Sequence, residues 1–128
     1  MVQTENEKML FEDEKKINNS IYKKYMKSVL YKTIRKDLLD QLDRTSTVGK
    51  YYKDLVDDYM DMWITKSMLV EDIKERGVRV YYCNGGGQYG YKKNESVDQR
   101  MKINAQMLKL LSELGIKPAQ AGGEEDEL

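Results

Sequence analysis

Six basic residues between positions 23 and 36 are the first candidates for chemistry, because their spacing would let them follow a phosphate backbone. If 20–43 forms one helix, Lys24, Lys32 and Arg35 lie on the face opposite its apolar residues. Two interpretations fit, a DNA-binding surface or a solvated helix face whose lysine chains cover the core, and the spacing alone favours the second. The predicted DNA-binding residues, with Tyr22, Tyr25 and Tyr31 between them, are Lys23, Lys24, Lys27, Lys32, Arg35 and Lys36.

Two glycine-containing motifs resemble phosphate-binding loops but lack the context that such loops need. Residues 85–90 (GGGQYG) fit the pattern G-x-G-x-x-G, yet a dinucleotide site needs this run between a strand and a helix of a βαβ unit. No second such unit is present, so we interpret the run as a flexible hairpin tip. Val48-Gly49-Lys50 is not a P-loop, since Arg44 replaces the first glycine and Tyr51 follows the lysine.

The side chains needed for common catalytic sites are scarce. The chain has no histidine and only one cysteine, Cys83, which excludes Ser/His/Asp and Cys/His triads, an internal disulfide and a multi-cysteine metal site. The acidic residues are spread over solvent faces, so a carboxylate metal site is not expected. We therefore predict a protein that is not an enzyme and has no cofactor or metal.

Length and charge indicate a single domain with a heavily solvated surface. Of 128 residues, 40% are hydrophobic and 34% are charged, and the net charge is zero. The charges are nevertheless segregated, with acidic residues at 54–61 and in the tail GEEDEL, and their distribution sets where a polyanion docks. No apolar run approaches the ~20 residues that span a bilayer, and residues 1–16 lack the apolar stretch of a signal peptide. A cytoplasmic location is expected.

The hydrophobic periodicity predicts a mostly α fold with about three main helices and a small β-hairpin. Ser20 is the expected N-cap of the first helix and Ser96 that of the third, while Gly77 and Gly115 end the second and third. Tyr59 and Trp63 are expected in the core. The predicted divisions are a polar segment at 1–19, a helical core at 20–118 and a flexible acidic tail at 119–128, the core comprising helices at 20–43, 51–76 and about 96–114 and the hairpin at about 78–92.

The third helix has two apolar faces, and one monomer with three helices buries only one of them easily. Either the helix is central and fully buried, or its second face contacts another copy, and the sequence favours neither. Tyrosines are also enriched at interfaces, which makes the hairpin tyrosines candidates for subunit contact. The predicted oligomer-interface residues are Tyr81, Tyr89, Met101, Leu108 and Leu111.

The order of elements over about 20–118 resembles the phage terminase small subunit family. The resemblance rests on the helix pair that ends at Gly77, the short strand pair, Lys93-Asn94, the long last helix and residues 111–118, LSELGIKP. Two positions depart from the family pattern. Glu95 stands where proline often follows the asparagine, and 119–122 lack the arginine that usually follows the terminal proline, so no role of that arginine is carried over.

The resemblance implies a ring-like homo-oligomer that binds viral packaging-start DNA and recruits and regulates the large terminase subunit, which carries the ATPase and nuclease. The small subunit of this family is not itself a catalyst. The implied partners are viral double-stranded DNA, the large subunit and further copies of the chain, in the cytoplasm of a phage-infected or lysogenic bacterium and without a membrane. The alternative is a small helical protein-interaction or regulatory module that does not bind DNA.

Overall fold

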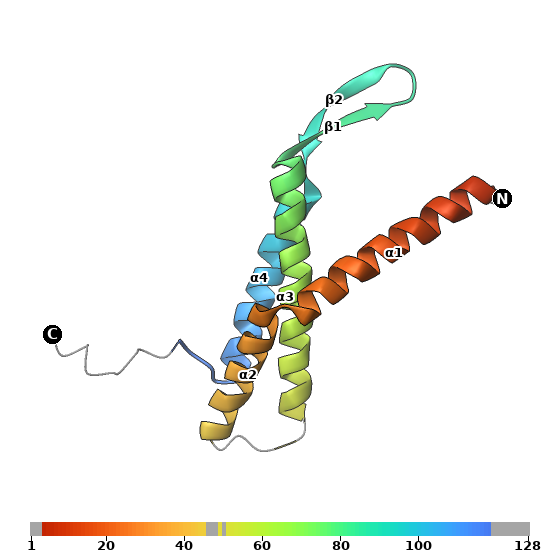
Figure 1. Ribbon diagram of the computed structural model, residues 1–128. Coiled ribbons are helices and arrows are strands. Elements are labelled where there is room, and N and C mark those ends of the chain that lie inside the picture. The colour runs from red at the N-terminus through yellow and green to blue at the C-terminus, as the bar shows by residue number, and fades with distance from the viewer. Residues whose placement is uncertain (1–3, 46–48, 50, 119–128) are drawn as a thin grey trace.

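The computed structural model describes residues 4–45, 49 and 51–118, and these form four helices and one hairpin. Helices α2, α3 and α4 lie side by side as a bundle, α1 leaves the bundle at an angle, and the hairpin extends beyond the end of α3 (Figure 1). The mostly α fold with a small hairpin is confirmed. The predicted acidic tail, 119–128, lies outside the described residues.

Helix α1 (Glu5–Lys27) begins far earlier than the sequence predicted. Thr4 caps it through a reciprocal pair of bonds, in which its Oγ1 accepts from the Glu7 amide at 3.1 Å and its own amide donates to the Glu7 carboxylate at 3.0 Å. The predicted start of the first helix at Ser20 was therefore wrong, and Ser20 lies inside a helix. No residue of α1 is buried.

The prediction of a single helix over 20–43 was also wrong, because the helix is interrupted at Ser28. Ser28 has extended backbone angles and ends α1 while it caps α2 (Val29–Arg44). Its hydroxyl donates to the Tyr25 carbonyl at 2.8 Å and accepts from the Tyr31 amide at 3.1 Å. A serine that bonds the local backbone in this way competes with helical hydrogen bonds, and the break turns α1 away from the bundle.

Helix α3 (Tyr51–Arg76) is the centre of the bundle and has the predicted bounds. Val56, Met60 and Ile64 are fully buried along one row of this helix. The prediction missed Met60 and Ile64, which face inward because α3 lies between α2 and α4. Tyr59 and Trp63, expected in the core, are half-buried and pack against it.

The hairpin and the last helix follow the predicted order. Strand β1 (Arg79–Asn84) pairs antiparallel with β2 (Gln88–Lys93). Helix α4 (Glu95–Glu113) then runs back along α3 and ends as predicted, with Gly115 in the left-handed region at φ 69°. The Ile116 amide donates to the Leu111 carbonyl at 3.0 Å and the Gly115 amide to the Ser112 carbonyl at 3.0 Å, which satisfies carbonyls at the helix end.

Asn94, and not the predicted Ser96, caps α4, and it is the buried member of a polar cluster. Its Oδ1 accepts from the Ser96 amide at 3.0 Å, and its Nδ2 donates to the Gly77 carbonyl at 3.0 Å and to Asp72 at 3.1 Å. The Asp72 carboxylate also accepts from Ser96 Oγ at 2.7 Å and from both Nε and Nη2 of Arg76 at 2.7 and 2.8 Å. We call these four residues, Asp72, Arg76, Asn94 and Ser96, the Asp72–Asn94 cluster.

Replacing Asn94 with alanine is expected to destabilise the fold strongly. The side chain is 1% exposed, and its loss leaves the Gly77 carbonyl and the Ser96 amide without their partner. We expect a loss of about 2–4 kcal/mol in the free energy of unfolding, measured by urea denaturation. Asn18→Ala, in exposed α1, is the control and should change stability by less than about 0.5 kcal/mol. A loss at Asn94 as small as that of the control would contradict the structural role.

Candidate nucleic-acid interface

The break at Ser28 divides the six predicted DNA-binding residues between two helices. Lys23, Lys24 and Lys27 lie near the end of α1, and Lys32, Arg35 and Lys36 lie on α2. Because α1 leaves the bundle at an angle (Figure 1), the six do not form one continuous helical face. The two groups have different electrostatic surroundings.

The three lysines on α1 are joined by a fourth that the sequence analysis missed. Lys16 lies seven positions before Lys23, two helical turns away, and both line one shallow depression. If the predicted helix had begun before residue 16, the spacing of 16, 23 and 27 would have placed Lys16 on the same face as Lys23 and Lys27. We call this set, Lys16, Lys23, Lys24 and Lys27, the α1 basic cluster.

The α1 basic cluster is largely free of carboxylate partners among the described residues. Lys24 Nζ lies 3.9 Å from Glu71 Oε1, and the lysine side chain remains 68% exposed. The other three make no ion pair within 4 Å in the part of the chain that the structure describes. Lys24 and Lys27 also lie in the last turn of α1, where the helix dipole favours positive charge.

The basic residues on α2 are interleaved with acidic ones. Arg35 Nε lies 3.2 Å from Asp57 Oδ1, and Lys36 Nζ lies 3.2 Å from Asp40 Oδ2. Such exposed pairs add little stability, but they place negative charge where a phosphate would have to approach. The α2 group is therefore the weaker candidate for DNA contact.

Two tyrosines that alternate with the lysines in sequence turn inward and fasten α1 to α3. The Tyr22 hydroxyl donates to Asp61 Oδ1 at 2.8 Å, and the Tyr25 hydroxyl donates to Glu71 Oε2 at 2.5 Å. The bond to Asp61 raises the pKa of Tyr22 to about 12, and burial together with the Glu71 bond raises the pKa of Tyr25 to about 12. Lys24 shares Glu71 with Tyr25, whereas Lys16, Lys23 and Lys27 make no ion pair with α3 in the described part of the chain.

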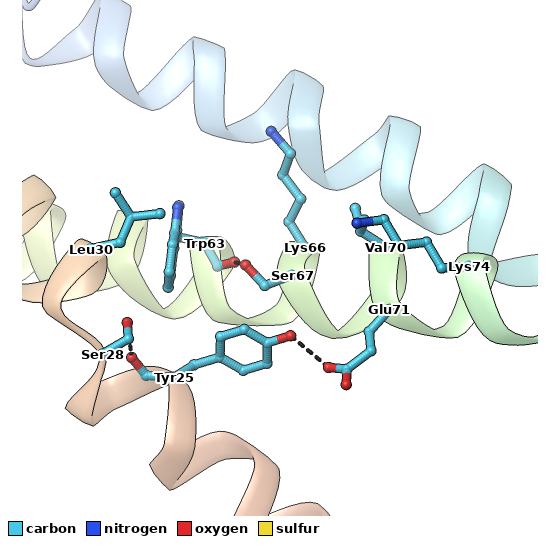
Figure 2. A pocket seen from close by; sticks show the side chains of 9 residues that line it. All are labelled: Tyr25, Ser28, Leu30, Trp63, Lys66, Ser67, Val70, Glu71 and Lys74. Atoms are coloured by element: carbon cyan, nitrogen blue, oxygen red, sulfur yellow. Dashed lines mark hydrogen bonds between the residues drawn. The ribbon is translucent and has the colours of Figure 1, made fainter.

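An open, mostly apolar groove of about 510 Å³ lies at the junction of α1, α2 and α3. Figure 2 shows the side chains of Tyr25, Leu30 and Trp63 that line this groove. Lys66 points toward α4, where its Nζ donates to Asn104 Oδ1 at 2.9 Å. The Tyr25 and Trp63 rings meet edge to face, with centroids 6.1 Å apart. Around the break, Met26, Val29 and Leu30 are exposed.

Helix α4 buries one of its two apolar faces and leaves the other open. Met107 is buried, and Leu111 packs against the core of its own chain. Met101 and Leu108 are 64% and 60% exposed, so α4 is not a fully buried central helix. Of the predicted interface residues on this helix, the structure leaves Met101 and Leu108 available and turns Leu111 inward.

The hairpin presents three tyrosine rings on one face. Tyr81 pairs directly with Tyr91, and Tyr89 lies two pairs further toward the tip, on the same face of the ribbon. The Tyr81 and Tyr89 rings are stacked with centroids 6.3 Å apart, and the Tyr91 ring meets Tyr81 edge to face at 5.6 Å. The Arg79 guanidinium lies 5.7 Å from the Tyr91 ring centre. We call Tyr81, Tyr89 and Tyr91 the hairpin aromatic face.

The described residues also bear on two other classes of site. Within residues 4–45, 49 and 51–118, no three acidic or cysteine side chains converge as a metal site would require. None of the helices in the described part of the chain has the length and apolar character needed to cross a membrane.

Comparison with known proteins gives one match. The family model described as phage terminase, small subunit, matches residues 32–123, which is well over half of the chain. The match includes most of α2 and all of α3, the hairpin and α4, and it begins after α1. Neither the curated proteins nor the solved structures contain a match to the chain.

Removing the two tyrosine hydroxyls that fasten α1 is expected to loosen it in a pH-dependent way. We predict that Tyr22→Phe with Tyr25→Phe lowers the free energy of unfolding at neutral pH by about 1–2 kcal/mol. Because folding raises both pKa values from about 10 to about 12, the contribution is complete below about pH 10 and is lost as the pH rises through about 12.

Denaturation of the wild type and the double variant across this pH range tests the assignment. Tyr51→Phe, at an exposed tyrosine at the start of α3, is the matched control and should leave stability unchanged. A difference between wild type and double variant that stays constant from neutral pH to above about pH 12 would show that the hydroxyls do not fasten α1.

Proposed function

Because this chain belongs to the phage terminase small subunit family, with a role in phage genome packaging, we propose that it binds viral packaging-start DNA and recruits and regulates the large terminase subunit. The family match is the observation that carries this proposal. The α1 basic cluster supports it, since exposed cations are what a phosphate backbone requires and three of its four lysines have no carboxylate partner among the described residues. On this proposal the chain has no catalytic activity and acts in the cytoplasm of the host bacterium.

The DNA contact is proposed for α1 and not for α2. Lys16, Lys23 and Lys27 of α1 make no ion pair among the described residues, whereas Arg35 and Lys36 already face Asp57 and Asp40. A few lysines on one subunit give only weak, sequence-independent affinity. Repetition of the cluster in an oligomer multiplies the phosphate contacts and raises avidity without a strong single site.

The proposed assembly is a ring-like homo-oligomer. A closed ring is built from heterologous contacts, so each subunit needs two different surfaces that fit each other. The described residues offer two such apolar surfaces, one around Leu30 and the groove beside it, and one on α4 at Met101 and Leu108. Leu111 is proposed to support the second surface from inside its own chain, since it packs against the core.

Recruitment of the large subunit follows from the family and is tested by direct binding. Purified small and large subunits are expected to associate at micromolar concentration, and the association should change the ATPase rate of the large subunit. Absence of both effects would contradict this part of the proposal.

Neutralising the α1 lysines should weaken duplex binding much more than neutralising the α2 group. We predict that Lys23→Gln, Lys24→Gln and Lys27→Gln together reduce duplex affinity at low salt by about tenfold or more and flatten its dependence on salt, because fewer counterions are released. The measurement is fluorescence anisotropy with a labelled duplex at several salt concentrations.

The α2 residues supply a matched control with the same number of charges removed. Lys32→Gln, Arg35→Gln and Lys36→Gln together should reduce affinity only slightly, with native mass unchanged in both triple variants. Equal losses from the two triples would show that the division at Ser28 has no bearing on DNA binding.

Charged substitutions on the exposed face of α4 should break the assembly without unfolding the subunit. We predict that Met101→Asp with Leu108→Asp yields smaller particles in light scattering, because a carboxylate cannot be buried unpaired in an apolar contact. Both side chains are exposed in the monomer, so the helical content in circular dichroism should be unchanged. A double variant with the mass of the wild type would exclude this face from the interface.

A further inference from the structure

The hairpin has a second surface suited to nucleic acid, separate from the α1 basic cluster. We propose that the hairpin aromatic face binds unpaired nucleobases by stacking, while Arg79 and Lys93 contact the neighbouring phosphates. The chemistry is that of a single-stranded segment, of DNA or of RNA. The inference rests on the proposed function only for its expectation that the strand is DNA.

The rings of the aromatic face are available to a ligand. Tyr81, Tyr89 and Tyr91 are 58%, 63% and 64% exposed, although tyrosine usually buries part of its ring when it serves the core of its own chain. They lie on one side of a ribbon that extends beyond the bundle (Figure 1). A strand of bases could therefore reach this face without displacing another element.

The charge of the hairpin favours a polyanion. Between Gly77 and Asn94 the chain has Arg79, Lys92 and Lys93 and no acidic residue. Arg79 and Lys93 are directly opposite each other at the base of the aromatic face, which concentrates positive charge there. Lys93 Nζ pairs with Asp98 at 2.5 Å, whereas Arg79 has no carboxylate partner among the described residues.

A second copy of the chain fits this face less well. Pairing two hairpins face to face would bring two such pairs of cations together, which disfavours the contact. The exposed apolar side chains that suit a neighbouring copy lie elsewhere, on α4 and around Leu30. Aromatic rings interleaved with cations are instead the surface that single-stranded nucleic acids recognise, with a base on a ring and phosphate near the cation.

Side chains on the opposite face of the ribbon stabilise the hairpin, so the aromatic face can be altered without changing the structure of the hairpin. Tyr82 lies across the strand from Gly90, where an added Cβ would meet the Tyr82 hydroxyl at 3.1 Å. Gly90 thus lets this ring cover the partner strand. Threonine, like tyrosine, favours strands. Replacing the tyrosines of the aromatic face with threonine therefore removes their rings with least effect on the hairpin.

The test compares full-length wild type with the triple variant Tyr81→Thr, Tyr89→Thr and Tyr91→Thr. Anisotropy is measured with labelled oligo-dT, oligo-U and a duplex at low salt, and native mass is measured on the same samples. We expect the triple variant to lose about tenfold or more in oligo-dT affinity, with duplex affinity and native mass unchanged. Tyr51→Thr, at an equally exposed tyrosine far along α3, should change none of these.

The sole cysteine gives a second readout that needs no variant. Cys83 is exposed and lies opposite Tyr89 on the same face. Saturating oligo-dT is expected to slow alkylation of Cys83 in the wild type several-fold, while a duplex should not. Alkylation that oligo-dT leaves unchanged would overturn the proposal.

The remaining outcomes are equally distinct. Tyrosine-dependent binding of oligo-dT or of oligo-U supports the proposal, and the tighter of the two identifies the strand. Unchanged oligo-dT affinity in the triple variant, an equal loss for duplex, or a fall in native mass would overturn it, the last by showing that the face holds another copy. A different result, wild type that does not bind duplex, would contradict the proposed function.

Discussion

The Asp72–Asn94 cluster is the constraint on which the rest of the structure depends. It joins the end of α3, the base of the hairpin and the start of α4 through one nearly inaccessible side-chain amide and one carboxylate. The Asp72 carboxylate accepts bonds from Arg76, Ser96 and Asn94, and these hold its pKa well below the usual range. Satisfied polar networks of this kind specify a unique arrangement, because a partly satisfied one is costly.

The direction that this cluster gives to α4 has consequences along the whole bundle. With α4 fixed at its first residue, Met107 turns toward α3 and Met101 and Leu108 turn outward. The same cluster fixes the root of the hairpin through the Asn94 amide, which donates to the Val78 carbonyl at 2.8 Å. One polar site thus helps to set which apolar face of α4 is left exposed and where the tyrosines of the ribbon are presented.

Helix α1 is held by a different kind of interaction. Its contacts with α3 include the two hydroxyl–carboxylate bonds, the Lys24–Glu71 pair and the edge of Tyr25 against Trp63, and none of its residues is buried. Segments with few buried apolar contacts open more readily than the core. An arm of this kind can adjust to the course of a duplex while the bundle keeps its packing, which suits a DNA contact repeated around an assembly.

Much of the fold could be predicted from the sequence, because several signals are local. The bounds of α3 follow from its periodicity and Gly77, and the hairpin follows from the alternation around its glycine-rich turn. The break at Ser28 could not be predicted in this way, since the apolar period continues on both sides of this position and the break depends on the bonds of Ser28 to the Tyr25 carbonyl and the Tyr31 amide.

The candidate site was predicted less completely than the fold, because it depends on pairs distant in sequence. The six basic residues were predicted as one group on a single helix, whereas the structure divides them between α1 and α2. Their different electrostatic surroundings depend on Asp57 and Glu71 of α3. Asn94 was seen as part of a motif, whereas its structural role depends on Asp72, twenty-two residues earlier. Neither partnership leaves a signal in local spacing.

The central claim is that copies of this chain assemble and present many α1 clusters to one duplex. The most direct measurement is the native mass of the full-length chain, alone and with a duplex at low salt. The account predicts one discrete oligomer larger than a dimer, which gains the mass of a single duplex and loses it as salt is raised. A monomer or dimer at micromolar concentration, or an oligomer whose mass does not change with DNA, would contradict it.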